Sequence, residues 1–111
     1  MNFWYFLDKL VKKHKIIIDR PKGTAHPRYP NFIYPLDYGY LKNTTAVDNS
    51  GIDIFVGSSR KKQVRGILAS VDLNKNDTEI KILYACTKNE MLIAQKSLNI
   101  KFMRTKLTIR S

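Results

Sequence analysis

The acidic residues of the chain fall where several of them could share one site. Seven of the nine Asp and Glu residues lie between positions 19 and 79. Asp48 and Asp53 bound a turn that opens a predicted strand, Asp72 closes another strand, and Glu79 lies two residues before Lys81. If these strands are neighbours, their ends bring several carboxylates and one ammonium together. Carboxylates at that density suit Mg²⁺ or Mn²⁺, and without a cation they would repel one another. The spacing therefore predicts a metal site.

Basic residues surround this acidic centre. The chain has 20 Lys and Arg residues and a formal net charge of +11. They gather in 9–15, 60–65 and 96–110. We expect Lys22, Arg28 and Lys81 at the rim of the acidic site to hold an anion such as phosphate. A small phosphorylated anion is thus the favoured partner, and nucleic acid is the second alternative that the charge leaves open.

Other classes of site are disfavoured by composition. No Ser/His/Asp or Cys/His arrangement is apparent, so covalent catalysis is not expected. The single cysteine, Cys86, can form neither an internal disulfide nor a CxxC zinc site, and its apolar neighbours predict a buried thiol. Positive charge follows the apolar N-terminal residues rather than preceding them, which is unlike a secretory signal. We therefore expect a cytoplasmic protein with no membrane partner.

The elements that must position these residues are short strands between two helices. Apolar residues spaced by three and four in 2–14 predict an amphipathic helix that packs on the domain. A helix lying on a membrane surface is the sharper alternative. A second, short helix is predicted at 90–96, capped by Thr87 or Asn89. The predicted strands are 15–19, 32–34, 38–41, 52–57, 64–72, 80–86 and 99–110.

These elements predict a mainly β (α+β) fold. All four prolines lie in 20–35, which indicates an extended loop. Short strands separated by turn signals predict a small closed β-barrel with helices at its ends. The expected single domain, 1–111, consists of an N-terminal helix in 1–14, a barrel core in 15–86, and a helix with a tail in 87–111.

The order of the motifs resembles that of the soluble (family I) inorganic pyrophosphatases over residues 16 to about 86. The matching features are Tyr34-Pro35-x-x-Tyr38-Gly39-Tyr40, Asp48-x-x-x-x-Asp53, the strand ending at Asp72, and Glu79-Ile80-Lys81. The resemblance implies an OB-like barrel that hydrolyses diphosphate. It also implies several Mg²⁺ ions, which supply the nucleophilic hydroxide and neutralise the leaving phosphate. We expect a homo-oligomer.

The resemblance also implies a role for each matching residue. The implied metal ligands are Asp19, Asp48, Asp53, Asp72 and Glu79. The implied phosphate contacts are Lys22, Arg28, Tyr38 and Lys81, and the implied catalytic residues are Tyr38, Asp53 and Lys81. The turn before Glu79 is two residues longer than the family pattern, so Asp77 and Glu79 could exchange roles.

The chain also departs from the family pattern. Ser50 stands where the family has an aspartate that acts as general base, and loss of a positioned base costs roughly 10² to 10⁴ in rate. Two features of the family pattern, an early hairpin and a C-terminal Tyr-Lys pair, are missing from this sequence. The alternative function is therefore a catalytically degenerate barrel whose basic surface binds a phosphorylated ligand or nucleic acid.

Overall fold

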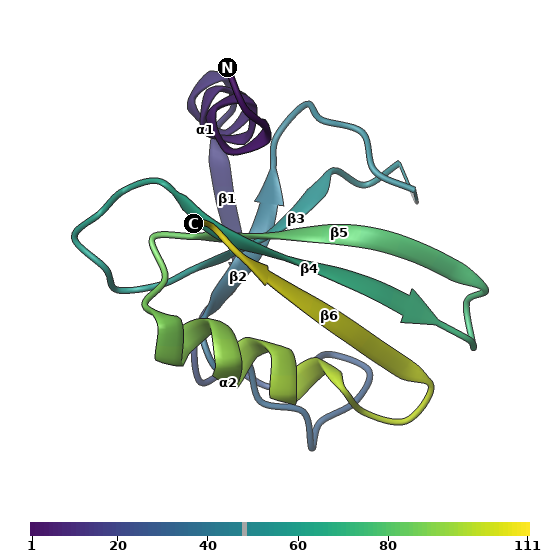
Figure 1. The fold of residues 1–111 in the computed structure, drawn as a ribbon. Helices are drawn as coiled ribbons and strands as arrows, with labels where there is room; N and C mark the ends of the chain where they lie inside the picture. The colour runs from purple at the N-terminus through teal and green to yellow at the C-terminus, as the bar shows by residue number, and fades with distance from the viewer. Residues whose placement is uncertain (48) are drawn as a thin grey trace.

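The structure, a computed structural model, describes residues 1–47 and 49–111 and contains two helices and six strands (Figure 1). In chain order these are α1 (Phe3–Lys13), β1 (Ile16–Arg20), β2 (Asp37–Leu41), β3 (Ile52–Val56), β4 (Val64–Asp72), β5 (Asp77–Tyr84), α2 (Lys88–Leu98) and β6 (Met103–Ile109). The mainly β fold with a helix near each end is confirmed.

The six strands form one sheet in the order β1-β2-β3-β5-β4-β6. Every pair is antiparallel except β3 and β5, which are parallel. In the described residues β1 and β6 do not pair, so the sheet is open and the predicted closed barrel is not confirmed. Helix α2 covers part of the β6 edge instead: the Thr105 backbone N–H donates to Asn99 Oδ1 (2.7 Å), and the Thr105 carbonyl accepts from Gln95 Nε2 (3.4 Å).

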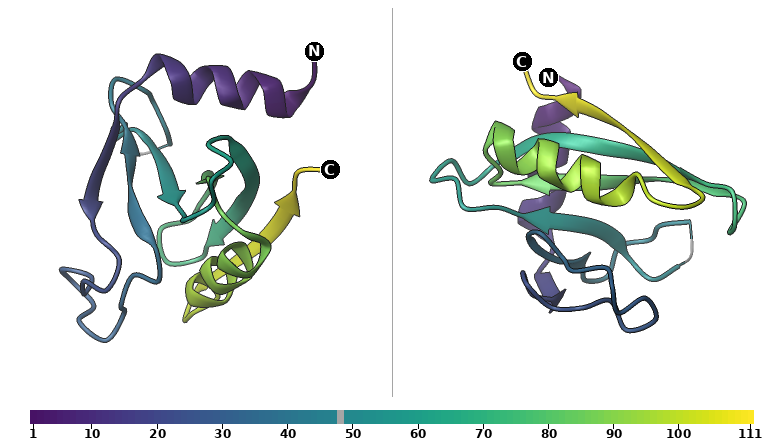
Figure 2. Two further views of the ribbon diagram at one scale, coloured as in Figure 1. Left: turned by 90° about the vertical axis from the view of Figure 1, so that its left-hand side faces the viewer. Right: turned by 90° about the horizontal axis from the view of Figure 1, so that it is seen from below.

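The helices cover opposite faces of this sheet (Figure 2). Val11 of α1 packs with Ile82 of β5, whereas Met91 of α2 packs with Leu83, the next residue of the same strand. Successive side chains of a strand point to opposite faces, so one strand supplies both cores. Burial of each such side chain stabilises the fold by roughly 1.5 to 3 kcal/mol.

Local signals explain most element ends. Thr87 caps α2 and forms a capping box with Glu90, so the helix begins earlier and runs longer than predicted. The β4–β5 register shifts between Val64 and Gly66, as at a β-bulge. The predicted strand 32–34 is wrong: only an isolated bridge between Ala25 and Ile33 forms there. The flanking prolines explain this, because they cannot donate to a ladder.

In the described residues, neither helix is long and apolar enough to cross a membrane.

Candidate active site

Lys81 is the centre of a buried polar cluster on β5. The residue is 4% exposed, and its Nζ donates to Glu79 Oε1 (2.7 Å), Asp53 Oδ2 (2.8 Å) and Tyr38 Oη (3.1 Å). The Tyr38 hydroxyl in turn donates to Asp53 Oδ2 (2.7 Å). All three protons of the ammonium thus have an acceptor. Four of the predicted site residues lie in direct contact.

Strand register brings the cluster together. In the β2–β3 ladder Tyr40 lies opposite Asp53, and Tyr38 is two residues away on the same face. In the parallel β3–β5 ladder Ile54 lies opposite Ile82, which places the preceding residues of the two strands on the other face. Asp53 and Lys81 therefore lie on the same face of the sheet, and α2 covers another part of that face.

Gly39 explains why a glycine stands between the two tyrosines. A Cβ at this position would overlap the Ile17 carbonyl oxygen of β1. Strands β1 and β2 therefore approach so closely that no other residue fits without a backbone shift. This close approach holds Tyr38 and Tyr40 on the face of the candidate site.

The surroundings of Lys81 keep it protonated. Burial alone would lower the pKa of Lys81, but interactions with Tyr38, Asp53 and Glu79 more than offset this, and its pKa is raised. Burial also raises the pKa of Tyr38. At neutral pH the cluster therefore holds an ammonium and a neutral phenol, whose four donor hydrogens are all bonded inside the cluster.

A bulge in β1 places Arg20, rather than Asp19, opposite Tyr38. The β1–β2 register pairs Ile18 with Gly39 and then Arg20 with Tyr38, which skips Asp19. Arg20 Nη1 donates to the Tyr34 hydroxyl (2.7 Å), and Asp19 is exposed. The sequence reasoning missed Arg20. The Arg-Pro pair at the end of a strand was the one signal that could have indicated an irregular end there.

The remaining predicted carboxylates have other positions. Asp48 lies outside the described residues. Asp72 Oδ1 accepts from the backbone N–H groups of Asn74 (2.9 Å) and Lys75 (3.1 Å), so it stabilises the β4–β5 turn. Asp77 lies opposite Asp72 at the end of this hairpin. Of the two residues whose roles were exchangeable, only Glu79 pairs with Lys81.

No group of three or more His, Cys, Asp or Glu residues within 1–47 and 49–111 is placed to hold a metal ion. The structure brings Asp53 and Glu79 together, each within 2.8 Å of Lys81 Nζ.

The predicted phosphate contacts Lys22 and Arg28 lie on the loop that follows β1. Both are exposed. The Lys22 backbone N–H donates to Asp37 Oδ1 (2.9 Å), and the Arg28 backbone N–H donates to His26 Nδ1 (3.0 Å). The His26 ring stacks on Tyr34, with centroids 6.1 Å apart. The loop backbone is therefore anchored near Tyr34, while the two cationic side chains are on the surface.

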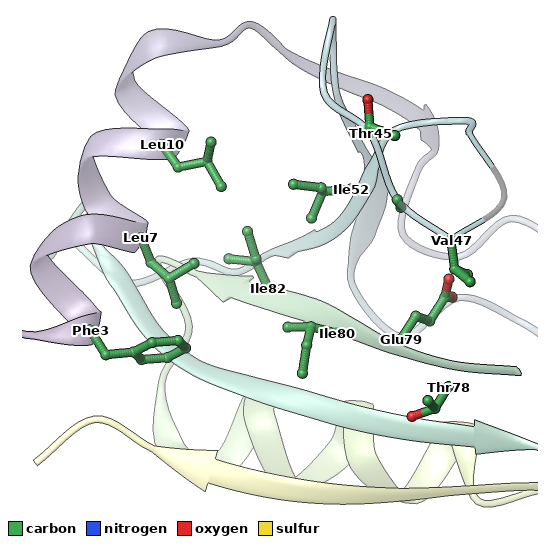
Figure 3. A pocket seen from close by; sticks show the side chains of 11 residues that line it. Phe3, Leu7, Leu10, Thr45, Val47, Ile52, Thr78, Glu79, Ile80 and Ile82 are labelled. Carbon is green, nitrogen blue, oxygen red and sulfur yellow. The ribbon is translucent and has the colours of Figure 1, made fainter.

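Two hollows flank the cluster. One of about 340 Å³ is lined by Tyr40 and by the loop that includes Ser50. The other, of about 310 Å³, lies between α1 and β5 and is mostly apolar, with Glu79 in its wall (Figure 3). Tyr40, which lines the polar hollow, is the register partner of Asp53.

Comparison with solved structures identifies the class of fold. The chain is similar to an inorganic pyrophosphatase from Helicobacter pylori, with a TM-score of 0.59 and 14% identity, over 85% of this chain and 81% of that one. An inorganic pyrophosphatase from Coxiella burnetii gives a TM-score of 0.61 and 13% identity, over 85% and 84%. One from Neisseria gonorrhoeae gives 0.54 and 15%, over 82% and 71%.

The fold is therefore similar to that of the inorganic pyrophosphatases. No protein-family model matches the chain, and neither does any curated protein sequence. At these identities the similarity shows the fold alone, and activity has to be argued from the site.

Proposed function

We propose that the chain is a Mg²⁺-dependent hydrolase of diphosphate or of a related small phosphoanhydride. The observation that supports this most is the buried Lys81, held by Asp53, Glu79 and Tyr38 in a fold similar to that of pyrophosphatases. We include in the proposal a cytoplasmic location, a homo-oligomer and an OB-like arrangement of the strands.

Lys81 would act on the phosphoryl group mainly through its buried positive charge, which is already in place when negative charge develops on phosphoryl oxygens. Lys81 and Tyr38 donate to Asp53, and Lys81 also donates to Glu79, so each donor would exchange one of these hydrogen bonds for one to the substrate. Arg20, on the same face, adds a permanent positive charge. Lys22 and Arg28 would contact the far end of the anion from the loop above, where their exposed side chains are free to adapt.

The carboxylates beside Lys81 are compatible with Mg²⁺, but they offer the ion only two ligands. Lys81 contacts one oxygen each of Asp53 and Glu79, which leaves the second oxygen of each carboxylate available. Mg²⁺ is commonly held by one or two carboxylates together with substrate phosphates and waters. Asp53 and Glu79 would hold the ion, with Asp48 as a further ligand that the resemblance implies. The bound ion would lower the pKa of a water and neutralise phosphate charge.

The test is phosphate release from diphosphate in the presence of Mg²⁺ or Mn²⁺. We compare the unaltered chain with Asp53→Asn and Lys81→Met. The matched control is Lys75→Met, which removes a lysine in the turn of the same hairpin. We expect release by the unaltered chain and by the control, and a loss of about 100-fold or more in the two site variants.

Two results would contradict the proposal. One is equal release by all four proteins, which would indicate a contaminant. The other is no release by any of them. Calorimetric titration with diphosphate separates the alternatives in the latter case, because binding that depends on Lys81 but gives no turnover would support the catalytically degenerate ligand-binding domain.

A further inference from the structure

Helix α1 exposes aromatic side chains that the candidate active site does not use. Phe3 is 55% exposed and Phe6 is 63% exposed, although Trp4, Leu7 and Val11 of the same helix pack on the sheet. Exposed aromatic residues in the first turns of a helix cost free energy in water. Their exposure calls for a partner surface.

This apolar surface continues onto the sheet. Phe3 and Ile80 line the same hollow (Figure 3), and Ile80 is itself 43% exposed. In the antiparallel ladders Ala69 lies opposite both Ile80 and Lys106. Paired residues share one face of a sheet. A row of side chains on this face therefore runs from Phe3 of α1 across Ile80 of β5 and Ala69 of β4, and it ends at the cation of Lys106 on β6.

Cations surround the apolar part. The exposed basic side chains of α1 and β6 are Lys9, Lys12, Lys13, Arg104 and Lys106. The two carboxylates near this surface are neutralised: Asp8 Oδ2 lies 2.9 Å from Arg110 Nη1, and Glu79 pairs with Lys81. We call the surface formed by Phe3, Phe6, Ile80, Lys9, Lys13, Arg104 and Lys106 the aromatic–basic face.

We propose that the aromatic–basic face binds an anionic lipid surface. Exposed phenylalanines beside lysines are the pattern by which a helix lies in a membrane interface, with its rings among the acyl chains and its cations at anionic headgroups. This favours the alternative left open for the N-terminal helix. Nucleic acid fits less well, because phosphate contacts would leave Phe6 exposed. A second copy fits less well, because the same cations would face each other across the two-fold axis.

The test is co-sedimentation with vesicles of phosphatidylcholine, with and without phosphatidylserine. We expect binding that requires phosphatidylserine and weakens as salt is added. The variant Phe3→Ser/Phe6→Ser should bind at least about 10-fold more weakly. The matched control is Leu92→Ser/Ile93→Ser, which removes an exposed apolar pair from α2 and should bind like the unaltered chain.

A folding check accompanies each variant, by circular dichroism and thermal unfolding. Where the double variant is unstable, Phe6→Ser alone serves, because Phe6 is the more exposed ring. The proposal is overturned if no vesicle is bound, if neutral vesicles bind equally well, or if the control loses binding to the same extent. It is also overturned if size-exclusion chromatography shows a dimer that the Phe6 variant dissociates, or if single-stranded DNA binds and Phe6→Ser has no effect on vesicles.

Discussion

Lys81 Nζ lies 2.8 Å from Asp53 Oδ2, between residues that come from two parallel strands and are 28 positions apart in the chain. The side chain of Lys81 is 5% exposed and that of Asp53 is 24% exposed. The ion pair therefore joins β3 and β5 at the point where the proposed substrate would bind. The stability of the fold and the proposed function would therefore depend on the same contact.

Removing the ammonium should destabilise the fold. In Lys81→Met, Asp53 and Glu79 lose their shared cation in a partly buried site, and breaking such a pair costs about 3 to 5 kcal/mol. The measurement is the free energy of unfolding in urea. The double variant Asp53→Asn/Lys81→Met should recover part of this loss because one uncompensated charge is removed. An unfolding free energy for Lys81→Met within about 0.5 kcal/mol of the unaltered value would contradict the buried pairing.

Alkaline pH should weaken the fold through the same cluster. The pKa values of Lys81 and Tyr38 are both raised in the folded state. Groups with raised pKa values stabilise the fold fully below their unfolded-state values, about 10 to 10.4, and lose this contribution as pH rises through the folded-state values.

The free energy of unfolding should therefore fall above about pH 10, by about 1.4 kcal/mol per pH unit for each group. The variant Tyr38→Phe should show a shallower fall, whereas Tyr29→Phe, which alters an exposed loop tyrosine, should not. Parallel pH profiles for the unaltered chain and Tyr38→Phe would argue against the role of Tyr38.

Ser50 should limit the rate of the proposed hydrolysis. It lies in the loop that lines the hollow beside Tyr40. Restoring a carboxylate with Ser50→Asp should raise phosphate release by roughly 10² or more, since this is the usual contribution of a general base. The control is Ser50→Asn, because an asparagine side chain has nearly the same shape as an aspartate but no basic group. Equal rates for the two variants would show that position 50 does not serve as a base.

Glu90 should stabilise the start of α2 in a pH-dependent way. Burial opposes its charge, but hydrogen bonds from Thr87 and Ser58 lower the pKa of Glu90 below its ordinary value. We expect Glu90→Gln to lose about 1 kcal/mol at neutral pH.

A group with a lowered pKa stabilises the fold above its unfolded-state pKa, and this contribution disappears as pH falls through the folded-state pKa. The difference between Glu90→Gln and the unaltered chain should therefore shrink as pH falls below about 4.3, the ordinary pKa of a glutamate, and vanish once Glu90 is protonated in the folded state. Urea unfolding at several pH values measures it, with Asn89→Gln as the neighbouring control. A difference that is the same at every pH would rule out the carboxylate as its source.

Cys86 should resist thiol reagents in the folded chain. The residue is 2% exposed, and burial, together with the charge of Glu90, raises the pKa of Cys86 to about 12. Very little thiolate is therefore present at pH 8. We expect negligible labelling by iodoacetamide in buffer and complete labelling in urea. Rapid labelling of the folded protein would contradict a buried structural thiol.

Local patterns accounted for much of the fold. Periodicity predicted α1, the capping residues predicted the existence of α2 although not its full length, and β-branched runs predicted the strands of the sheet. These features depend on a residue and its near neighbours in the chain, which the sequence displays directly. The strand predicted at 32–34 was wrong because strand formation there also required a partner ladder that the prolines prevent.

The candidate site was predicted in part for the same reason. Residue type and order marked Tyr38, Asp53, Glu79 and Lys81, which the structure brings into contact. No local pattern could show that a bulge would put Arg20 opposite Tyr38, because a bulge shifts register relative to a neighbouring strand.

The sequence by itself determined the charge, the elements and the types of group available for chemistry. The tertiary structure alone decided which groups meet: it turned Asp72 toward its own hairpin and placed Lys81 between Asp53 and Glu79. It also left the sheet open and the rings of α1 exposed. The physical reason is that strand register and face depend on pairing between distant segments, which short-range spacing along a chain does not specify.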